Sequence, residues 1–421
     1  MNSRRPIIAL TGIGVVIVAI LTFVPYSLTM VKQAGHNVAA AVQTSLGKEA
    51  TPAFEAEMRR PIVPQYDVAL WYGGRGEEPE KHGVLIQTLD GRSVLASHNA
   101  DTTFNPASLA KLTVTLLALK RLGPDYRFGT RVLADGAVDA TGVLDGNLHL
   151  AGNDPSFGDA SANLIARELR ARGITRVKGK IFAAPGFSFN YNERAEESVG
   201  FAARVMQLKQ SGTGMEEARG TELFVLNSNP LREILLYMNA HSNNFVADRL
   251  GAFLGGTQAI KRVLVEELKL PPEQVSLETA SGLYNNRMTP RGVLVVIKAL
   301  LEEAGRKGLR AEDLLPVVGC DWGTVRRRME GTGFECSLVG KTGTLTTTDG
   351  GMSNLAGVVF TKEGEPILFA ILAQGNRIWE HKQMTDQLLA ETMNGRQPAP
   401  LLEAGTRRQL LPPNNLKVSG K

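Results

Sequence analysis

The sequence predicts an α+β fold, in which helices flank an antiparallel sheet and a smaller α+β domain is inserted into the main one. Three observations predict it. A hairpin pattern occurs near residue 90, three closely spaced strand patterns occur near the C-terminus, and strong helical patterns lie before and after those strands. Between the hairpin and the later helices, residues 128–220 change character and form a unit of short strands with one helix.

The hairpin pattern joins residues 84–89 to residues 93–96 through Asp90-Gly91, a dipeptide typical of tight hairpin turns. After Pro106 the apolar residues follow helical spacing until Gly123-Pro124 ends the pattern. The expected main domain therefore comprises residues 65–127 and 221–396, around an insert at 128–220.

The insert has expected strands near 131–134, 148–151 and 177–183, and a helix near 160–172. The main domain resumes with helices, continues with strands and closes with a helix. These are expected at 231–240, 243–254 and 290–303 (helices), 337–343, 354–361 and 366–373 (strands), and 378–393 (closing helix). We find no internal repeat.

Composition is that of an ordinary globular protein: 421 residues, 43% hydrophobic and 21% charged. A chain of this length is sufficient for two or three domains. The formal net charge of +5 suits an anionic partner, but scattered solvated lysines and arginines explain it equally well. The longest basic run is Arg326-Arg327-Arg328, too short to indicate a charged tail, and no nucleic-acid partner is expected.

The N-terminus carries an export signal. Arg4 and Arg5 precede an uncharged apolar run of 18 residues at 7–24. Apolar regions of signal peptides span about 7–15 residues and membrane-spanning helices about 17–25, so residues 1–31 are either a cleaved signal peptide or a membrane anchor. In both cases the arginines keep the N-terminus in the cytoplasm and the rest of the chain is exported, to the periplasm or the outer face of the cytoplasmic membrane.

Two segments lack periodicity. Residues 32–64 are polar, alanine-rich and contain prolines, which is typical of a tether. Residues 397–421 contain four prolines and are expected to be disordered.

The two cysteines, Cys320 and Cys336, lie 16 positions apart. An oxidising compartment permits a disulfide between them, which would contribute about 3 kcal/mol by closing a loop of that size. Two free buried cysteines are the alternative. No Cys/His group has metal-ligand spacing, so neither a metal nor another cofactor is expected.

Three short elements carry the chemistry. The first runs from Ser108 to Lys111 in the first turn of an expected helix, where residues three apart share a face. A serine hydroxyl becomes nucleophilic when an adjacent base takes its proton, and a lysine serves as that base when burial or a nearby cation lowers its pKa. Lys341, in the third element, would supply that cation. A helix-capping serine is the alternative for Ser108.

The second element, Ser242 and Asn244, opens an expected helix, where the alternative is a simple N-cap. Functionally, the hydroxyl could relay a proton to a leaving amine and the amide could hold a substrate amide.

The third element, Lys341 to Thr344, lies on an expected strand, where an ordinary hairpin strand is the alternative. Lys341 and Thr342 could bind a terminal carboxylate, and Gly343 lets an extended peptide approach the strand edge. The backbone N–H of Thr344, with that of Ser108, would form an oxyanion hole.

Together the three elements resemble the Ser-x-x-Lys, Ser-x-Asn, Lys-Thr-Gly set of penicillin-binding proteins and serine β-lactamases. The interval from Lys111 to Ser242 is 131 residues and that from Ser242 to Lys341 is 99. A long first interval resembles the class C low-molecular-mass penicillin-binding proteins, the D-alanyl-D-alanine carboxypeptidase/endopeptidase family. Further stretches at 148–155, 173–181, 229–231, 315–324 and 340–345 resemble that family, and the resemblance covers about residues 80–395.

The resemblance implies a penicillin-binding/serine β-lactamase-like fold and an acyl-enzyme on Ser108, with Lys111 as general base. It implies peptidoglycan peptide stems as substrates, β-lactam antibiotics as covalent inhibitors, and no cofactor. Two departures stand out. The insert is shorter than in the family's longest members, and the family's Asp-Gly-Ser-Gly-Leu element appears here as Thr279-Ala280-Ser281-Gly282-Leu283.

Two alternatives remain open. One is a weakly active or inactive penicillin-binding scaffold of the cell-wall machinery, which the altered Thr279-Ala280 pair motivates. The other is a β-lactamase, but the Glu-x-x-Leu-Asn loop through which class A enzymes deacylate does not occur between Asn244 and Lys341. Penicillins are therefore expected to trap the enzyme rather than be destroyed by it.

Overall fold

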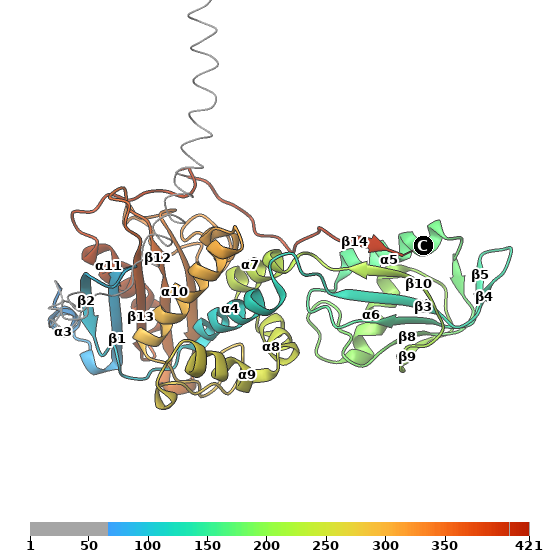
Figure 1. Ribbon diagram of the computed structural model, residues 1–421, viewed down its shortest axis with the longest axis horizontal. Coiled ribbons are helices and arrows are strands. Elements are labelled where there is room, and N and C mark those ends of the chain that lie inside the picture. Colours follow the sequence, from blue (N-terminus) through green and yellow to red (C-terminus); the bar gives the residue numbers. More distant parts are fainter. Residues whose placement is uncertain (1–65, 404, 421) are drawn as a thin grey trace, which may run out of the picture. The chain divides into compact units, whose positions relative to one another are not determined.

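A computed structural model of the chain describes residues 66–403 and 405–420 (Figure 1). The expected signal peptide or anchor at 1–31 and the tether at 32–64 lie outside the described residues. Within 66–403 and 405–420, no helix is long and apolar enough to cross a membrane.

The main domain is built on a five-stranded sheet with the strand order β11-β12-β13-β1-β2. Every neighbouring pair is antiparallel. The strands are β1 (His82–Thr88), β2 (Val94–His98), β11 (Leu338–Leu345), β12 (Met352–Val359) and β13 (Ile367–Gln374). The predicted hairpin and the three predicted C-terminal strands are confirmed.

Helices cover both faces of this sheet (Figure 1). On one face, α3 (Val68–Gly73) and α11 (Ile378–Thr392) share a core with β12 and β13. On the other, α10 (Pro290–Arg306) contacts β1, β12 and β13, and α4 (Lys111–Leu122) packs on α10. Because both faces are covered, β12 is buried along its whole length and its sequence shows no polar alternation.

The remaining helices of the main domain are short and lie beside α4. They are α7 (Leu231–His241), α8 (Asn244–Phe253) and α9 (Gly256–Arg262). Short 3-10 helices lie at Pro79–Lys81, Ala107–Ala110, Pro272–Gln274, Ala311–Asp313 and Thr348–Gly350, and a π-helical segment at Val263–Glu267 continues α9.

The insert contains its own sheet of six strands, in the order β14-β10-β3-β6-β8-β9, and a second sheet of three, in the order β4-β5-β7. Its two helices, α5 (Asp159–Ala171) and α6 (Ala195–Met206), share one apolar core with the larger sheet. The strands are β3 (Gly129–Ala134), β4 (Ala137–Val138), β5 (Val143–Asp145), β6 (Leu148–Ala151), β7 (Arg176–Val177), β8 (Ile181–Ala183), β9 (Thr213–Met215), β10 (Thr221–Asn227) and β14 (Lys417–Ser419).

The insert ends later than predicted. We placed its boundary at residue 220, but β10 pairs antiparallel with β3 over Thr221 to Asn227 and therefore belongs to the insert sheet. The last strand of an inserted domain returns to the first because the chain must leave close to where it entered. Residues 221–227 were not among the expected strands, and no local pattern indicates that they pair with β3.

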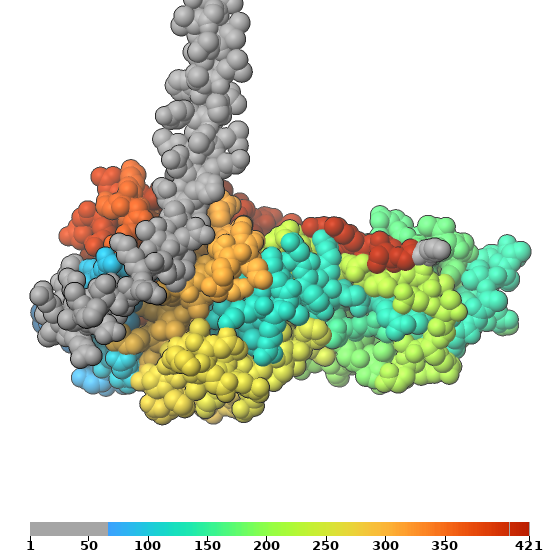
Figure 2. Space-filling model, viewed as in Figure 1, coloured from blue at the N-terminus to red at the C-terminus, as the bar shows by residue number. Residues whose placement is uncertain are grey.

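The prediction of a disordered tail after Arg396 is wrong for the described residues. Strand β14 extends the insert sheet by pairing with β10, and Figure 2 shows this C-terminal segment, in red, lying on the insert. Farther upstream, Arg408 forms two hydrogen bonds, of 2.7 and 2.6 Å, with the buried carboxylate of Asp321. The segment binds through its backbone, a few polar side chains and two apolar residues, Leu416 and Val418, which pack against the insert core. Two apolar residues are too few to give a periodicity from which its order could be predicted.

Cys320 and Cys336 are joined by a disulfide with a Cα–Cα distance of 5.4 Å. The C-terminal segment pairs with both ends of this bridge, because Leu401 N donates to Cys336 O and Arg408 N donates to Cys320 O. The disulfide therefore anchors the surface on which the C-terminal segment lies.

Candidate active site

Ser108 lies in a 3-10 helical turn that runs directly into a helix, close to the predicted first helical turn. The turn spans Ala107–Ala110, and α4 begins at Lys111. Ala107 has a φ of 48°, a left-handed conformation that non-glycine residues adopt rarely. The turn is covered by Gly282, where an added Cβ would lie 1.9 Å from Ala107 O. Only a glycine allows these two segments to approach so closely.

Lys111 is fully buried and its amine joins two of the predicted elements. Its Nζ donates to Ser108 Oγ at 2.9 Å, to Asn244 Oδ1 at 2.7 Å and to Ser281 O at 2.6 Å. Burial lowers the pKa of Lys111 to about 7, although the negative charge of Asp248 raises it. At neutral pH a large share of these amines is therefore neutral, which is the form that accepts a proton.

Lys341 joins the second and third elements. Its Nζ donates to Ser242 Oγ at 2.9 Å and to Thr342 O at 2.8 Å. Complete burial, and then the charge of Lys111, lower the pKa of Lys341 well below its usual value. The structure thus brings the five residues together as two hydrogen-bonded groups, Ser108-Lys111-Asn244 and Ser242-Lys341, and the charge of Lys111 acts on Lys341.

The second element does not cap its helix in the way that the alternative interpretation requires. Asn243 is the N-cap of α8, because its side chain accepts the N–H of Val246 at 3.0 Å. Ser242 ends α7 in a left-handed conformation, with a φ of 54°. Its hydroxyl and the Asn244 amide therefore contact the two lysines instead of the helix terminus.

Strand β11 lies directly against the Ser108 turn. A Cβ on Gly343 would lie 2.6 Å from Pro106 O and 3.2 Å from Ala107 Cβ. We predicted that Gly343 makes room for a peptide substrate, but in the structure its missing side chain makes room for this turn. Thr342 Oγ1 donates to Thr324 Oγ1 at 2.7 Å, and Thr344 is exposed at the end of the strand.

Sequence reasoning missed several residues that support the cluster. Asp248 Oδ1 accepts the N–H of Ser281 at 2.8 Å and lies one helical turn after Asn244. That spacing places both on one face of α8 and was a usable signal. Asn105 Oδ1 accepts the N–H of Ala107 at 3.0 Å, and its Nδ2 donates to Asp349 Oδ2 at 2.8 Å. No local pattern connects Asn105 to Asp349, which is 244 residues away.

The family model described as D-Ala-D-Ala carboxypeptidase 3 (S13) matches residues 76–188 and 205–394. The chain belongs to this family. A curated D-alanyl-D-alanine carboxypeptidase from Actinomadura sp. (strain R39) is 33% identical over 113 residues. That alignment spans 25% of this chain and only 21% of the relative.

Solved structures share the fold. The predatory peptidoglycan endopeptidase Bd3459 from Bdellovibrio bacteriovorus superimposes with a TM-score of 0.64 at 22% identity, covering 78% of this chain and 96% of the other. Penicillin binding protein 4 (dacB) from Haemophilus influenzae gives a TM-score of 0.59 at 18% identity, covering 73% and 96%. The predicted penicillin-binding/serine β-lactamase-like fold is confirmed.

Proposed function

We propose that the chain is a serine D-alanyl-D-alanine carboxypeptidase/endopeptidase that acts on peptidoglycan peptide stems through an acyl-enzyme on Ser108. One observation carries the proposal: the Lys111 amine lies 2.9 Å from Ser108 Oγ, and burial lowers the pKa of that amine to about 7. A serine nucleophile requires a base within hydrogen-bonding distance whose pKa lies near neutral pH, and Lys111 meets both conditions. Family membership supports the choice of substrate.

In the acylation step, Ser108 Oγ attacks the carbonyl carbon of the penultimate D-alanine and its proton passes to neutral Lys111. The Oγ–C bond forms and the C–N bond to the last residue breaks. The leaving amine takes up the proton, for which Ser242, hydrogen-bonded to Lys341, offers a second route. Water then hydrolyses the ester, with Lys111 again accepting a proton.

The other groups of the cluster position the substrate. Because Asn244 Oδ1 accepts from Lys111, its Nδ2 is left to donate to a substrate amide. Thr342 and Lys341 would bind the terminal carboxylate, and the approach of that anion would raise the pKa of Lys341 and favour its charged form. The N–H groups of Ser108 and Thr344 would form the oxyanion hole, where each donor is typically worth about 10²–10³ in rate.

The departures at Thr279 and Ala280 are compensated locally. Thr279 Oγ1 accepts the N–H of Gly282 at 3.2 Å and donates to Leu283 O at 3.0 Å, so a hydroxyl holds the turn without the family's acid. Ala280 fits because Gly251 faces it, where an added Cβ would lie 2.4 Å from Ala280 Cβ. These contacts support an active enzyme over an inactive scaffold.

The same proposal extends to location and inhibition. The substrate would lie outside the cytoplasm, in accord with the export signal that the sequence predicts for residues 1–31. One solved structure of the Bdellovibrio endopeptidase is described as acylated by penicillin G. We expect β-lactams to acylate Ser108 in this chain in the same way.

Fluorescent penicillin tests the proposal on the purified full-length chain beside Ser108→Ala and a control, Ser97→Ala. Covalent label on the native chain and on the control, with none on Ser108→Ala, is the expected result. Release of D-alanine from a pentapeptide stem, or cleavage of a cross-linked dimer, then distinguishes carboxypeptidase from endopeptidase activity. A folded native chain that takes no label and cleaves neither substrate would exclude the function.

A further inference from the structure

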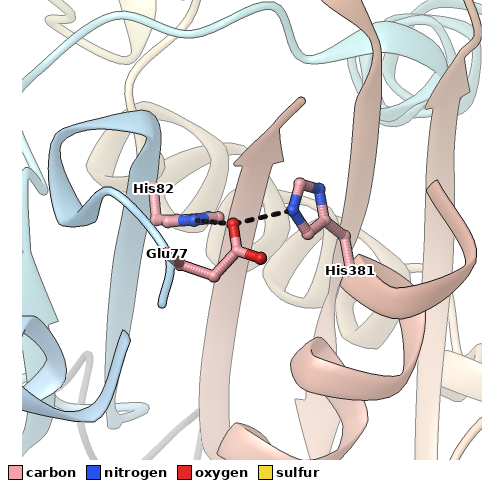
Figure 3. Close-up of side chains that lie close together, drawn as sticks. All are labelled: Glu77, His82 and His381. Atoms are coloured by element: carbon pink, nitrogen blue, oxygen red, sulfur yellow. Dashed lines mark hydrogen bonds and ion pairs between the residues drawn. The ribbon is translucent and has the colours of Figure 1, made fainter. Parts of the chain in front are cut away.

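A second group of chemically active side chains lies outside the candidate active site, where α3, β1 and α11 meet (Figure 3). Glu77 follows α3, His82 opens β1, and His381 lies in α11. One donor atom from each lies within 4.8 Å of the donor atoms of the other two. Among the described residues, no other three His, Cys, Asp or Glu side chains have donor atoms close enough together to share a metal ion.

Glu77 is held between the two imidazole rings (Figure 3). Its Oε2 lies 3.6 Å from His82 Nε2 and 3.1 Å from His381 Nε2. The other oxygen, Oε1, accepts a hydrogen bond of 2.8 Å from Arg377. Such an outer partner fixes the orientation of a ligating carboxylate. Arg377 is also a nearby cation, but its side chain is 52% exposed, so water screens its charge.

The group is buried, and part of its hydrogen-bonding capacity is unused. The exposed fraction is 0% for His82 and 2% for His381, and 10% for the Glu77 side chain. Neither ring nitrogen of His82 has a hydrogen-bond partner, nor does Nδ1 of His381. Buried ring nitrogens without partners are unusual and point to a missing ligand.

Both rings are fixed by their surroundings. The ring of Tyr72 stacks on His82, with centroids 3.8 Å apart and planes inclined by 2°. Gly375 leaves the space that His381 fills, since an added Cβ there would lie 2.6 Å from His381 Cε1. The donors are therefore arranged before any ligand arrives.

We propose that Glu77, His82 and His381 bind one divalent transition-metal ion, with Zn²⁺ as the first candidate. Tetrahedral zinc with bonds of about 2.0–2.1 Å places neighbouring donors about 3.3 Å apart, and the separations of 3.1 and 3.6 Å bracket that value. Two imidazoles and one carboxylate suit zinc, whereas Ca²⁺ and Mg²⁺ prefer oxygen ligands alone. Water would complete the coordination, as it does in zinc sites with three protein ligands.

The role of this metal is structural. Glu77 and His381 are 304 residues apart, so one ion ties the beginning of the main domain to its last helix. The ligands are buried on the side of the sheet covered by α3 and α11, away from the face on which α4 and α10 pack. The ion would hold α11 on the sheet without contacting the substrate.

Zinc titration of the full-length chain, first freed of metal with a chelator, tests the proposal. A chromophoric chelator competes for Zn²⁺, and the thermal midpoint is recorded with and without the ion. We expect one Zn²⁺ per chain and a Tm raised by a few degrees when zinc is in excess of its Kd. Glu77→Gln and His381→Gln should each weaken the Kd by at least about 100-fold, because each removes a direct ligand.

His149→Gln is the matched control. His149 is also buried, with a carboxylate, Asp135 Oδ2, 3.2 Å from its Nε2. It belongs to no group of three donors among the described residues. This variant should bind zinc as tightly as the native chain, with circular dichroism verifying the fold of all three variants. Equal zinc binding by His381→Gln and His149→Gln would overturn the site. If the ligand variants do not fold, the native chain still tests the proposal. A Tm of the native chain that does not change when stoichiometric Zn²⁺ is added would overturn the site as well.

Discussion

The pH dependence of acylation follows directly from the burial of Lys111. Only the neutral amine accepts the proton of Ser108, so acylation rises as the amine deprotonates. With a pKa of about 7, roughly a tenth of the amines are neutral at pH 6, half at pH 7 and nine tenths at pH 8. The acylation rate should therefore rise about tenfold between pH 6 and 8 and then level off.

An unperturbed lysine would behave differently. With a pKa of about 10.4, its neutral fraction would rise about 100-fold over the same interval and continue to rise. The measurement is the second-order rate constant for acylation by a fluorescent penicillin from pH 5.5 to 9.5, on the full-length chain. A rate that still increases tenfold per pH unit above pH 8 would refute the role assigned to Lys111.

Asp248→Asn sharpens this test. The negative charge of Asp248 raises the pKa of Lys111, so its removal should move the midpoint of the profile to lower pH. Asparagine keeps an oxygen that accepts the N–H of Ser281, so the loop contact remains. Asp101→Asn, at an exposed surface ion pair with Arg291, is the control and should leave the midpoint where it is.

Three further predictions concern the framework. Gly282→Ala should lower the acylation rate by at least about 100-fold, because the added Cβ would lie 1.9 Å from Ala107 O. The control is Gly308→Ala, at a residue with a similar positive φ but open space around it. This variant should lose only about 1 kcal/mol of stability and keep its acylation rate. Replacing both cysteines by serine should lower the free energy of unfolding by about 3 kcal/mol in denaturant titrations, and an unchanged midpoint would contradict the disulfide. Arg408→Gln leaves the buried Asp321 carboxylate without its ion-pair partner and should lower the free energy of unfolding by about 3–5 kcal/mol. The control, Arg291→Gln at the exposed pair with Asp101, should lower it by at most about 1 kcal/mol. Equal losses in the two variants would contradict this account.

The sequence was informative wherever the determining contacts are local. Ser108 and Lys111 are one turn apart, and the hairpin around Asp90-Gly91 joins adjacent strands, so spacing alone located both. Long-range pairing left no such signal. The partner of β10 lies about ninety residues upstream in β3, and the C-terminal segment is held by backbone pairing with β10 and by the distant Arg408–Asp321 ion pair. The disulfide could be stated only as a possibility, because its geometry depends on how two loops meet.

The conformation of the Ser108 turn shows why residues that never touch the substrate matter here. A non-glycine residue in a left-handed conformation, as at Ala107, costs about 1–3 kcal/mol and persists only where the surroundings enforce it. Three contacts enforce the left-handed conformation of Ala107. The Asn105 side chain accepts the N–H of Ala107, while Gly282 and Gly343 let two other segments close on the carbonyls of Ala107 and Pro106.

Asn105 is in turn fixed by a hydrogen bond from strand β12 of the main sheet. Asn354 Nδ2 donates to Asn105 O at 3.0 Å, and Asn354 Oδ1 accepts the N–H of Ala373 in the neighbouring strand. The turn that presents Ser108 to Lys111 is therefore fixed to the central strands of the main sheet rather than to a flexible loop. Rigid placement of this kind keeps the nucleophile within hydrogen-bonding distance of its base, which is the condition for a fast proton transfer. Substitutions at Asn354 should thus lower the acylation rate without changing the pH midpoint set by Lys111.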